Sequence, residues 1–134
     1  MRQYRLDFTQ IGIKDRFRPY FEIIIRNENT GKEIKTFGLL DTGADESALP
    51  GFYAKILGHD LDKGNKKEIM VAGGKTEAFR HTNKFLIPKI GLIKDILIDF
   101  IPNLHIPIIG LNIIENYNVF LYYQNRYFVM EDFR

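Results

Sequence analysis

The run Phe37 to Ala48, FGLLDTGADESA, constrains the fold of this 134-residue chain more than any other segment. Its centre, Leu39 to Ala44, places two leucines directly before Asp41 and small residues directly after it. This order predicts that a buried strand delivers the Asp41 carboxylate into a tight turn, with the Thr42 hydroxyl beside it. Gly43 leaves room for another backbone to approach closely. The alternative is an ordinary strand end with an Asx-type turn, since Asp and Gly are common in turns for local reasons.

Length and composition indicate one compact domain spanning residues 1–134, which is large enough to bury about two-thirds of its unfolded surface. The absence of Cys excludes disulfides, thiolate zinc sites and cysteine nucleophiles. The 19 basic and 17 acidic residues give a net charge of +2. The densest basic stretch, Lys63 to Lys67, is offset by neighbouring acids, so we interpret it as a solvated loop and expect no nucleic-acid partner.

The N-terminal residues contain no apolar core of signal-peptide length, and no segment approaches 18 consecutive apolar residues. We therefore expect a cytoplasmic protein with no membrane partner.

Most of the chain reads as short strands separated by turn signals. Alternation of apolar and polar residues over Tyr4 to Thr9 predicts a half-buried first strand. The apolar runs Tyr20 to Arg26 and Glu33 to Leu40 flank the turn signal Asn27 to Gly31 and predict a hairpin. Asp41 is therefore expected at the end of the third strand.

The remaining segments complete an all-β pattern with one or two short helices. Pro50 to Leu57 has helical spacing of Phe52, Ile56 and Leu57, with Gly58 as its stop. The other expected elements are a hairpin over Glu68 to Arg80, strands at Phe85 to Pro88 and Ile93 to Ile101, an apolar strand from Leu104 that breaks at Gly110 into a short helix, and a last hairpin of Val119 to Tyr122 with Tyr127 to Met130. Strands at this spacing predict a barrel-like domain.

A second segment, Ile108-Ile109-Gly110, repeats the order of two apolar residues before a glycine-containing loop. With the Asp41 segment and the hairpin between them, it resembles the retropepsin-like aspartic proteases, the bacterial and eukaryotic type more than the viral enzymes. The resemblance spans about Tyr20 to Leu121. It implies the closed-barrel acid-protease fold, with the two apolar segments forming crossed loops behind a catalytic Asp41, and it implies aspartic endopeptidase activity without a cofactor.

The chain supplies only half of such a site. Efficient hydrolysis of an amide needs one ionised carboxylate as base and one neutral carboxyl as acid. The sequence contains one Asp-Thr-Gly-Ala segment, so the second Asp41 is expected from a second copy. The prediction is a homodimer with a two-fold axis through the site, where two Asp41 carboxylates activate one water.

The resemblance also implies supporting roles for the neighbours of Asp41. Thr42 would hold the two loops together across the two-fold axis, and Gly43 would present its carbonyl to an extended peptide. Ala44 and Asp45 would line a groove that binds the peptide as an added β-strand. A flap over the peptide would be formed by Val71, Ala72, Gly73 and Gly74. The alternatives are that Asp45 and Glu46 are solvated turn acids and that the flap is an ordinary surface hairpin.

One position departs from the viral pattern. The viral enzymes usually carry an arginine after the Gly110 position, and it pairs with the acid that corresponds to Asp45. This chain has Leu111 there, which cannot form that pair, so the local stabilisation of the dimer is expected to come from another contact.

The other titratable residues suggest no second site. His59, His81 and His105 lie in separate segments without metal-ligand spacing, and we expect no metal. Asp95 and Asp99 share a strand and a face, and we interpret both as edge or solvent charges.

The rival function, of a different class, is a non-catalytic peptide-binding or dimerisation module of the same fold.

Overall fold

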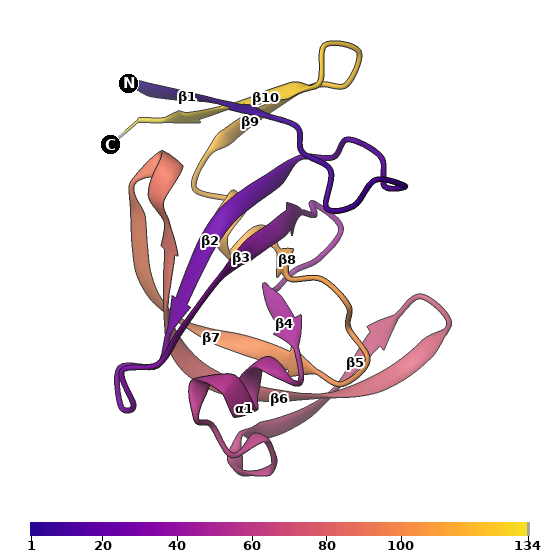
Figure 1. Ribbon diagram of the computed structural model, residues 1–134, viewed down its shortest axis with the longest axis vertical. Coiled ribbons are helices and arrows are strands. Elements are labelled where there is room, and N and C mark those ends of the chain that lie inside the picture. The colour runs from indigo at the N-terminus through magenta and orange to yellow at the C-terminus, as the bar shows by residue number, and fades with distance from the viewer. Residues whose placement is uncertain (134) are drawn as a thin grey trace.

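The computed structural model describes residues 1–133, and Arg134, the last residue of the expected domain, lies outside the described part. Figure 1 shows the strands curled into a barrel, with a small sheet of the two chain ends beside it. The strands are β1 (Arg2–Asp7), β2 (Tyr20–Arg26), β3 (Glu33–Leu40), β4 (Ala48–Pro50), β5 (Asn65–Val71), β6 (Gly74–Ile87), β7 (Leu92–Ile101), β8 (Ile108–Ile109), β9 (Asn118–Tyr122) and β10 (Tyr127–Asp132). The short α-helices are α1 (Tyr53–Leu57) and α2 (Leu111–Ile114), and 3₁₀ turns occupy Leu61–Lys63 and Pro88–Ile90.

The barrel is closed by hydrogen bonding between its first and last strands. The sheet order is β2-β3-β8-β4-β7-β6-β5, and β2 also pairs with β6, for example Ile25 opposite Phe85. Six strands therefore form the closed barrel, and β5 extends from it as the outer arm of the β5–β6 hairpin. The predicted all-β barrel with one or two short helices is confirmed.

Strand alternation explains how the barrel fills its interior. Side chains two residues apart point to the same face of a strand. Phe21, Ile23 and Ile25 of β2 are fully buried by this rule. Other strands contribute fully buried side chains to the same core, including Phe85, Ile87, Ile98, Phe100 and Ile109.

The two chain ends form a three-stranded antiparallel sheet of β1, β10 and β9. The predicted first strand is confirmed, with Leu6 and Phe8 buried. The sheet shares the barrel core through Phe128, whose ring meets that of Phe21 edge-on at a centroid distance of 5.2 Å. Both terminal strands therefore find partners within the same chain.

Helix α1 confirms the predicted helix, but its buried face differs from the expected one. The helix ends at Gly58, whose φ of 80° is a left-handed cap that favours glycine. Tyr53 and Leu57 face the core, whereas Phe52 and Ile56 are exposed. The helix is only five residues long, and packing on β3 decides its orientation more than spacing does.

Strands β6 and β4 also differ from the sequence predictions. The segments predicted as a hairpin arm ending at Arg80 and a separate strand at Phe85 form one continuous strand, β6, because it pairs along its length with β5, β7 and β2. Strand β4 was not predicted, since three residues carry too little pattern. None of the helices among residues 1–133 is long and apolar enough to span a bilayer.

Candidate active site

Asp41 lies where β3 ends, beside the second apolar segment. Strands β3 and β8 pair in parallel, with Leu40 opposite Ile109. The Asp41 backbone N–H donates to the Ile109 carbonyl at 2.9 Å. The two apolar segments that repeat each other in the sequence are therefore adjacent in space, behind the Asp41 side chain.

The Asp41 carboxylate is held by its own loop. Oδ1 accepts a hydrogen bond from the Gly43 backbone N–H at 2.9 Å, and the Asp41 carbonyl accepts one from the Ala44 N–H at 3.3 Å. This is the Asx-type turn that local preference alone also predicts. The turn by itself therefore does not distinguish a catalytic aspartate, and the surroundings of Asp41 must do so.

Those surroundings form a cleft of about 710 Å³, a size suited to ligand binding. The cleft brings together six of the nine residues predicted for the site: Asp41, Gly43, Ala44, Asp45, Val71 and Ala72. Apolar walls come from Ala48, Ile69, Met70, Ile101, Leu104 and Ile108. Of the remaining three residues, Thr42 is exposed next to Asp41, and Gly73 and Gly74 lie at the hairpin tip without lining the cleft.

The β5–β6 hairpin contributes one wall of this cleft. Val71 and Gly74 are paired, so the turn between them contains only Ala72 and Gly73. Gly73 and Gly74 have φ values of 93° and 138°, which L side chains rarely adopt. Glycine is therefore required at the tip by the tightness of the turn.

The loops after β3 and β8 cross at very close range. The Leu111 N–H donates to the Ala44 carbonyl at 2.8 Å, and the Asn112 N–H donates to the Asp45 carbonyl at 3.1 Å. A Cβ atom at Gly110 would lie 2.6 Å from the carbonyl carbon and oxygen of Glu46. Only glycine fits this crossing without a backbone shift.

A polar cluster next to Leu111 joins the two crossed loops within the chain. Asn112 Oδ1 accepts hydrogen bonds from the Ser47 backbone N–H at 2.9 Å and from its hydroxyl at 2.8 Å. Ser47 Oγ in turn accepts from the Gly110 N–H at 3.0 Å, and Ser47 is 0% exposed. Neutral hydrogen bonds thus tie the two loops together beside Leu111, the position at which the viral enzymes usually carry an arginine.

Comparison with known proteins finds no matching family model and no significantly matching curated sequence. Solved structures do match. A retropepsin-like aspartic protease from Rickettsia conorii aligns over 98% of this chain and 92% of its own, with 21% identity and a TM-score of 0.68. The EIAV protease in complex with the inhibitor HBY-793 aligns over 80% of this chain and 92% of its own, with 23% identity and a TM-score of 0.51. The chain has the retropepsin-like fold.

Within this retropepsin-like fold, the cleft contains an ionic cluster that the sequence reading missed. Asp99 is 4% exposed, which corrects its interpretation as an edge or solvent charge. Its carboxylate accepts from Arg80 Nε at 2.7 Å and pairs with Lys67 Nζ at 3.1 Å. Arg80 also reaches the Glu46 carboxylate at 3.5 Å, and its hydrogen bond to Asp99 raises the pKa of Arg80.

Asp99 is buried and Asp95 is exposed because neighbouring strands cover the two ends of β7 to different extents. Asp95 and Asp99 lie on the same face, but β4 pairs with β7 only over residues 99–101. Asp95 is therefore exposed, and Asp99 is enclosed between β4 and the base of the β5–β6 hairpin. An acid within the apolar run ILIDFI was the signal that could have revealed it, because a buried carboxylate requires cationic partners.

Two of the three histidines also lie together, although their sequence positions suggested unrelated sites. The rings of His59 and His81 stack at a centroid distance of 4.5 Å. His59 Nε2 bonds Asn83 Oδ1 at 2.7 Å, and His81 Nε2 bonds the Leu61 carbonyl at 3.2 Å. Burial lowers the pKa of His81. Among residues 1–133 no group of three or more His, Asp or Glu side chains is arranged to hold a metal ion.

Proposed function

We propose that this chain is an aspartic endopeptidase, active as a homodimer, that hydrolyses peptide bonds with a water activated between two Asp41 carboxylates. The observation that carries the proposal is the position of Asp41: β3 delivers it to the wall of the 710 Å³ cleft, and the Gly43 amide orients one of its oxygens. The retropepsin-like fold of the chain supports the same conclusion.

The acids within one chain do not complete the site, which supports the homodimer. Besides Asp41, the cleft contains Asp45, Glu46 and Asp99. Asp99 forms ion pairs with Lys67 and Arg80, and Glu46 forms an ion pair with Arg80. Asp45 belongs to the same short loop as Asp41, whereas acid–base chemistry needs a second carboxyl opposite the first. A second copy related by a two-fold axis supplies that carboxyl without any further motif.

The proposed reaction balances its protons between the two carboxyls. The ionised Asp41 removes a proton from the water while the water oxygen forms a bond to the peptide carbonyl carbon. The neutral Asp41 of the second copy donates its proton to the carbonyl oxygen, giving a gem-diol. Breaking the C–N bond then transfers one proton to the leaving amine and returns one to the carboxyl pair.

The substrate is proposed to bind in extended form along the cleft. Residues of the Asp41 loop and of the β5–β6 hairpin both line the cleft, so we propose that a peptide between them adds as a strand by main-chain hydrogen bonds, with the Gly43 carbonyl as one acceptor. Ala44, Asp45, Val71 and Ala72 would contact its side chains, and Gly73 and Gly74 at the tip would permit closure. Thr42 is proposed to hold the paired loops across the two-fold axis.

The decisive test is cleavage of a mixed peptide library by the wild type and by Asp41→Asn. Asn has nearly the same shape as Asp but cannot act as a base, so we expect activity to fall by at least about 100-fold. Unfolding by urea serves as the control that both proteins are equally folded. Full activity in Asp41→Asn would refute the assignment. Tight peptide binding by the wild type without any cleavage would identify the chain as a binding module of the same fold.

A further inference from the structure

The loop between β1 and β2, residues 8–19, exposes apolar side chains at its tip. Ile13 is 99% exposed and Ile11 is 49% exposed. The tip is a turn closed by a hydrogen bond from the Asp15 N–H to the Gly12 carbonyl at 3.0 Å. Turn positions favour Gly, Pro, Asn, Asp and Ser for local reasons, and none of these reasons applies to isoleucine. The local structure therefore does not account for Ile13.

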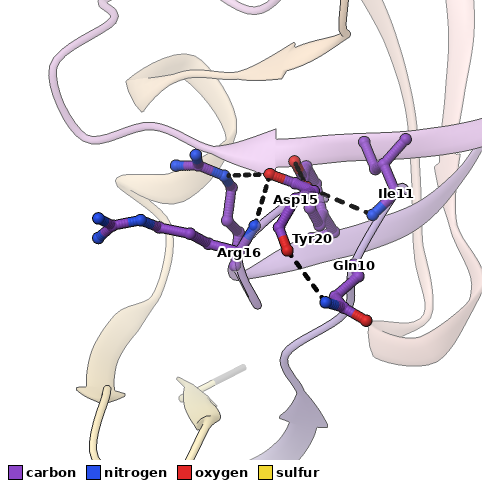
Figure 2. Close-up of polar contacts among 6 residues, drawn as sticks. Gln10, Ile11, Asp15, Arg16 and Tyr20 are labelled. Carbon is purple, nitrogen blue, oxygen red and sulfur yellow. Dashed lines mark hydrogen bonds and ion pairs between the residues drawn. The ribbon is translucent and has the colours of Figure 1, made fainter. Parts of the chain in front are cut away.

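The Asp15 carboxylate stabilises the conformation of this loop by accepting several hydrogen bonds. Figure 2 shows Asp15 at the centre of the contacts, reached by the backbone N–H groups of Ile11 at 3.3 Å and Arg16 at 2.8 Å. The Tyr20 hydroxyl and Arg18 Nε each donate to the same carboxylate at 3.0 Å. The Arg18 bond is the main cause that lowers the pKa of Asp15. A loop fixed in this way loses little conformational freedom when it binds a partner.

The base of the loop is also braced against the terminal sheet. Thr9 and Arg18 exchange backbone hydrogen bonds at 3.0 and 2.9 Å. The Arg126 guanidinium stacks on the Phe17 ring at 4.3 Å, and Tyr123 meets Phe8 edge-on at 5.2 Å. Phe8 is buried by these contacts and Phe17 keeps 38% of its surface exposed, so Ile13 is the most exposed apolar side chain of the loop, followed by Ile11.

The loop adjoins the segment that carries Asp41. The Pro19 carbonyl accepts a hydrogen bond from the N–H of Leu40, the residue before Asp41, at 2.9 Å. In Figure 1 the β1–β2 loop projects to the right, and the loop that follows β3 lies on the same side of the barrel. A second copy that places its Asp41 against this one must cover this side of the molecule.

We propose that Ile11 and Ile13 contact a second copy of this chain and help to hold the dimer that completes the Asp41 pair. The inference rests on the proposed function, because the Asp41 pair is what brings the partner to this face.

The direct test compares Ile13→Asp with the matched control Ile93→Asp, an isoleucine that is 66% exposed on β7. Sedimentation equilibrium over a range of concentrations gives the dimer dissociation constant of each. Placing a charge where an isoleucine is buried between copies is expected to raise that constant at least about 10-fold. The control should leave it unchanged. An Ile13→Asp variant that dimerises as tightly as the wild type would overturn the inference.

A second measurement reads the contact itself. The chain has no cysteine, so Ile13→Cys and Ile93→Cys each introduce a single thiol. The rate of modification by a water-soluble maleimide at position 13 is expected to fall as the protein concentration rises through the dimer midpoint, while the rate at position 93 stays constant. Equal rates at position 13 in monomer and dimer would contradict a buried tip.

Failure of the inference and failure of the proposed function give different results. A wild type that cleaves peptides, with an unchanged dimer constant in Ile13→Asp, overturns the loop contact alone. A wild type that dimerises without cleaving, and is weakened by Ile13→Asp, supports the loop contact and removes the enzyme assignment. A wild type that stays monomeric at every concentration overturns both.

Discussion

Gly110 shows how strongly one residue can be constrained by the crossing of two loops. The carbonyl groups of Glu46 and Ala44 lie where its side chain would be, at 2.6 and 2.8 Å from an added Cβ. The constraint is one of space, since the backbone of Gly110 is extended and open to any residue. The position therefore permits a direct test of how much the crossing contributes to stability.

Gly110→Ala is expected to lower the free energy of unfolding by about 1–3 kcal/mol, the range found when atoms are forced into a packed site. Urea denaturation measures this value. The control is Gly12→Ala, where no atom lies within 4 Å of the added Cβ and φ is not positive. That variant should be neutral or more stable by up to about 1 kcal/mol. Similar values for the two variants would show that the loops do not need the close approach.

His81 should make stability depend on pH. Burial lowers its pKa in the folded chain below the ordinary 6.5, so the unfolded chain takes up a proton first as the pH falls. The free energy of unfolding is therefore expected to decline as the pH drops through about 6.5 and to stop declining below the folded-state pKa.

The measurement is urea denaturation between pH 5 and 8 of the wild type and His81→Gln, which stays neutral over this range. His81→Gln should show a weaker decline, while the exposed control His105→Gln should keep the wild-type pH dependence. A decline of the same size in His81→Gln would assign it to other groups.

At the scale of single residues, only chemistry with a local signature could be predicted. Asp41 stands out because apolar residues precede it and small residues follow it. The His59–His81 pair carries no such signature, since its two rings come from segments distant in sequence. Asp99 is marked by the apolar run around it, but that run does not identify Lys67 and Arg80 as its partners. Their environments arise from packing, which residue order does not reveal.

At the scale of elements, the β5–β6 hairpin is joined to the barrel by the Asp99 cluster. Lys67 of β5 and Arg80 of β6 both bind the Asp99 carboxylate of β7. Removing one partner of a buried carboxylate leaves charge without compensation. The base of the hairpin is thus anchored electrostatically beside the cleft, while its tip contains two glycines.

Arg80→Met is expected to lower the free energy of unfolding by about 3 kcal/mol, because it removes the shorter of the two contacts to Asp99. The matched control is Lys75→Met in the same strand, which removes the solvent-exposed ion pair with Glu68 and should cost at most about 1 kcal/mol. Urea denaturation compares the two. Equal losses would mean that the burial of Asp99 contributes nothing beyond a surface ion pair.

The strands β2 and β3 were predicted well, whereas the 14-residue strand β6 was predicted as two pieces and the three-residue strand β4 was not predicted. The hairpin of β2 and β3 follows from its apolar runs and the turn between them. Strand β4 has three residues and is defined by its neighbours β7 and β8. Helix α1 was placed correctly, but Phe52 and Ile56 were assigned to the wrong face because five residues do not establish a helical stripe.

At the scale of the whole molecule, the proposed dimer predicts that inactive subunits lower the activity of wild-type subunits by forming mixed dimers with them. Asp41→Asn subunits should pair at random with wild-type subunits, and each mixed pair would have one functional carboxyl. Adding an equal amount of Asp41→Asn to a fixed, fully dimeric wild type should therefore reduce activity to about one half. Peptidase assays with serum albumin in place of the variant serve as the control. Unchanged activity would show that each copy works alone.

Residue order was enough to predict the barrel class and the strand that delivers Asp41, because strand periodicity and turn chemistry are local. The second carboxyl stays a prediction. Only the tertiary structure decided that Asp99 is buried, that two histidines stack and that a rigid loop stands beside Asp41. Each of these depends on pairs of residues far apart in the chain. Which sequence-distant residues come into contact is decided when the strands pair and the barrel closes. The register of the paired strands then determines which side chains lie next to one another.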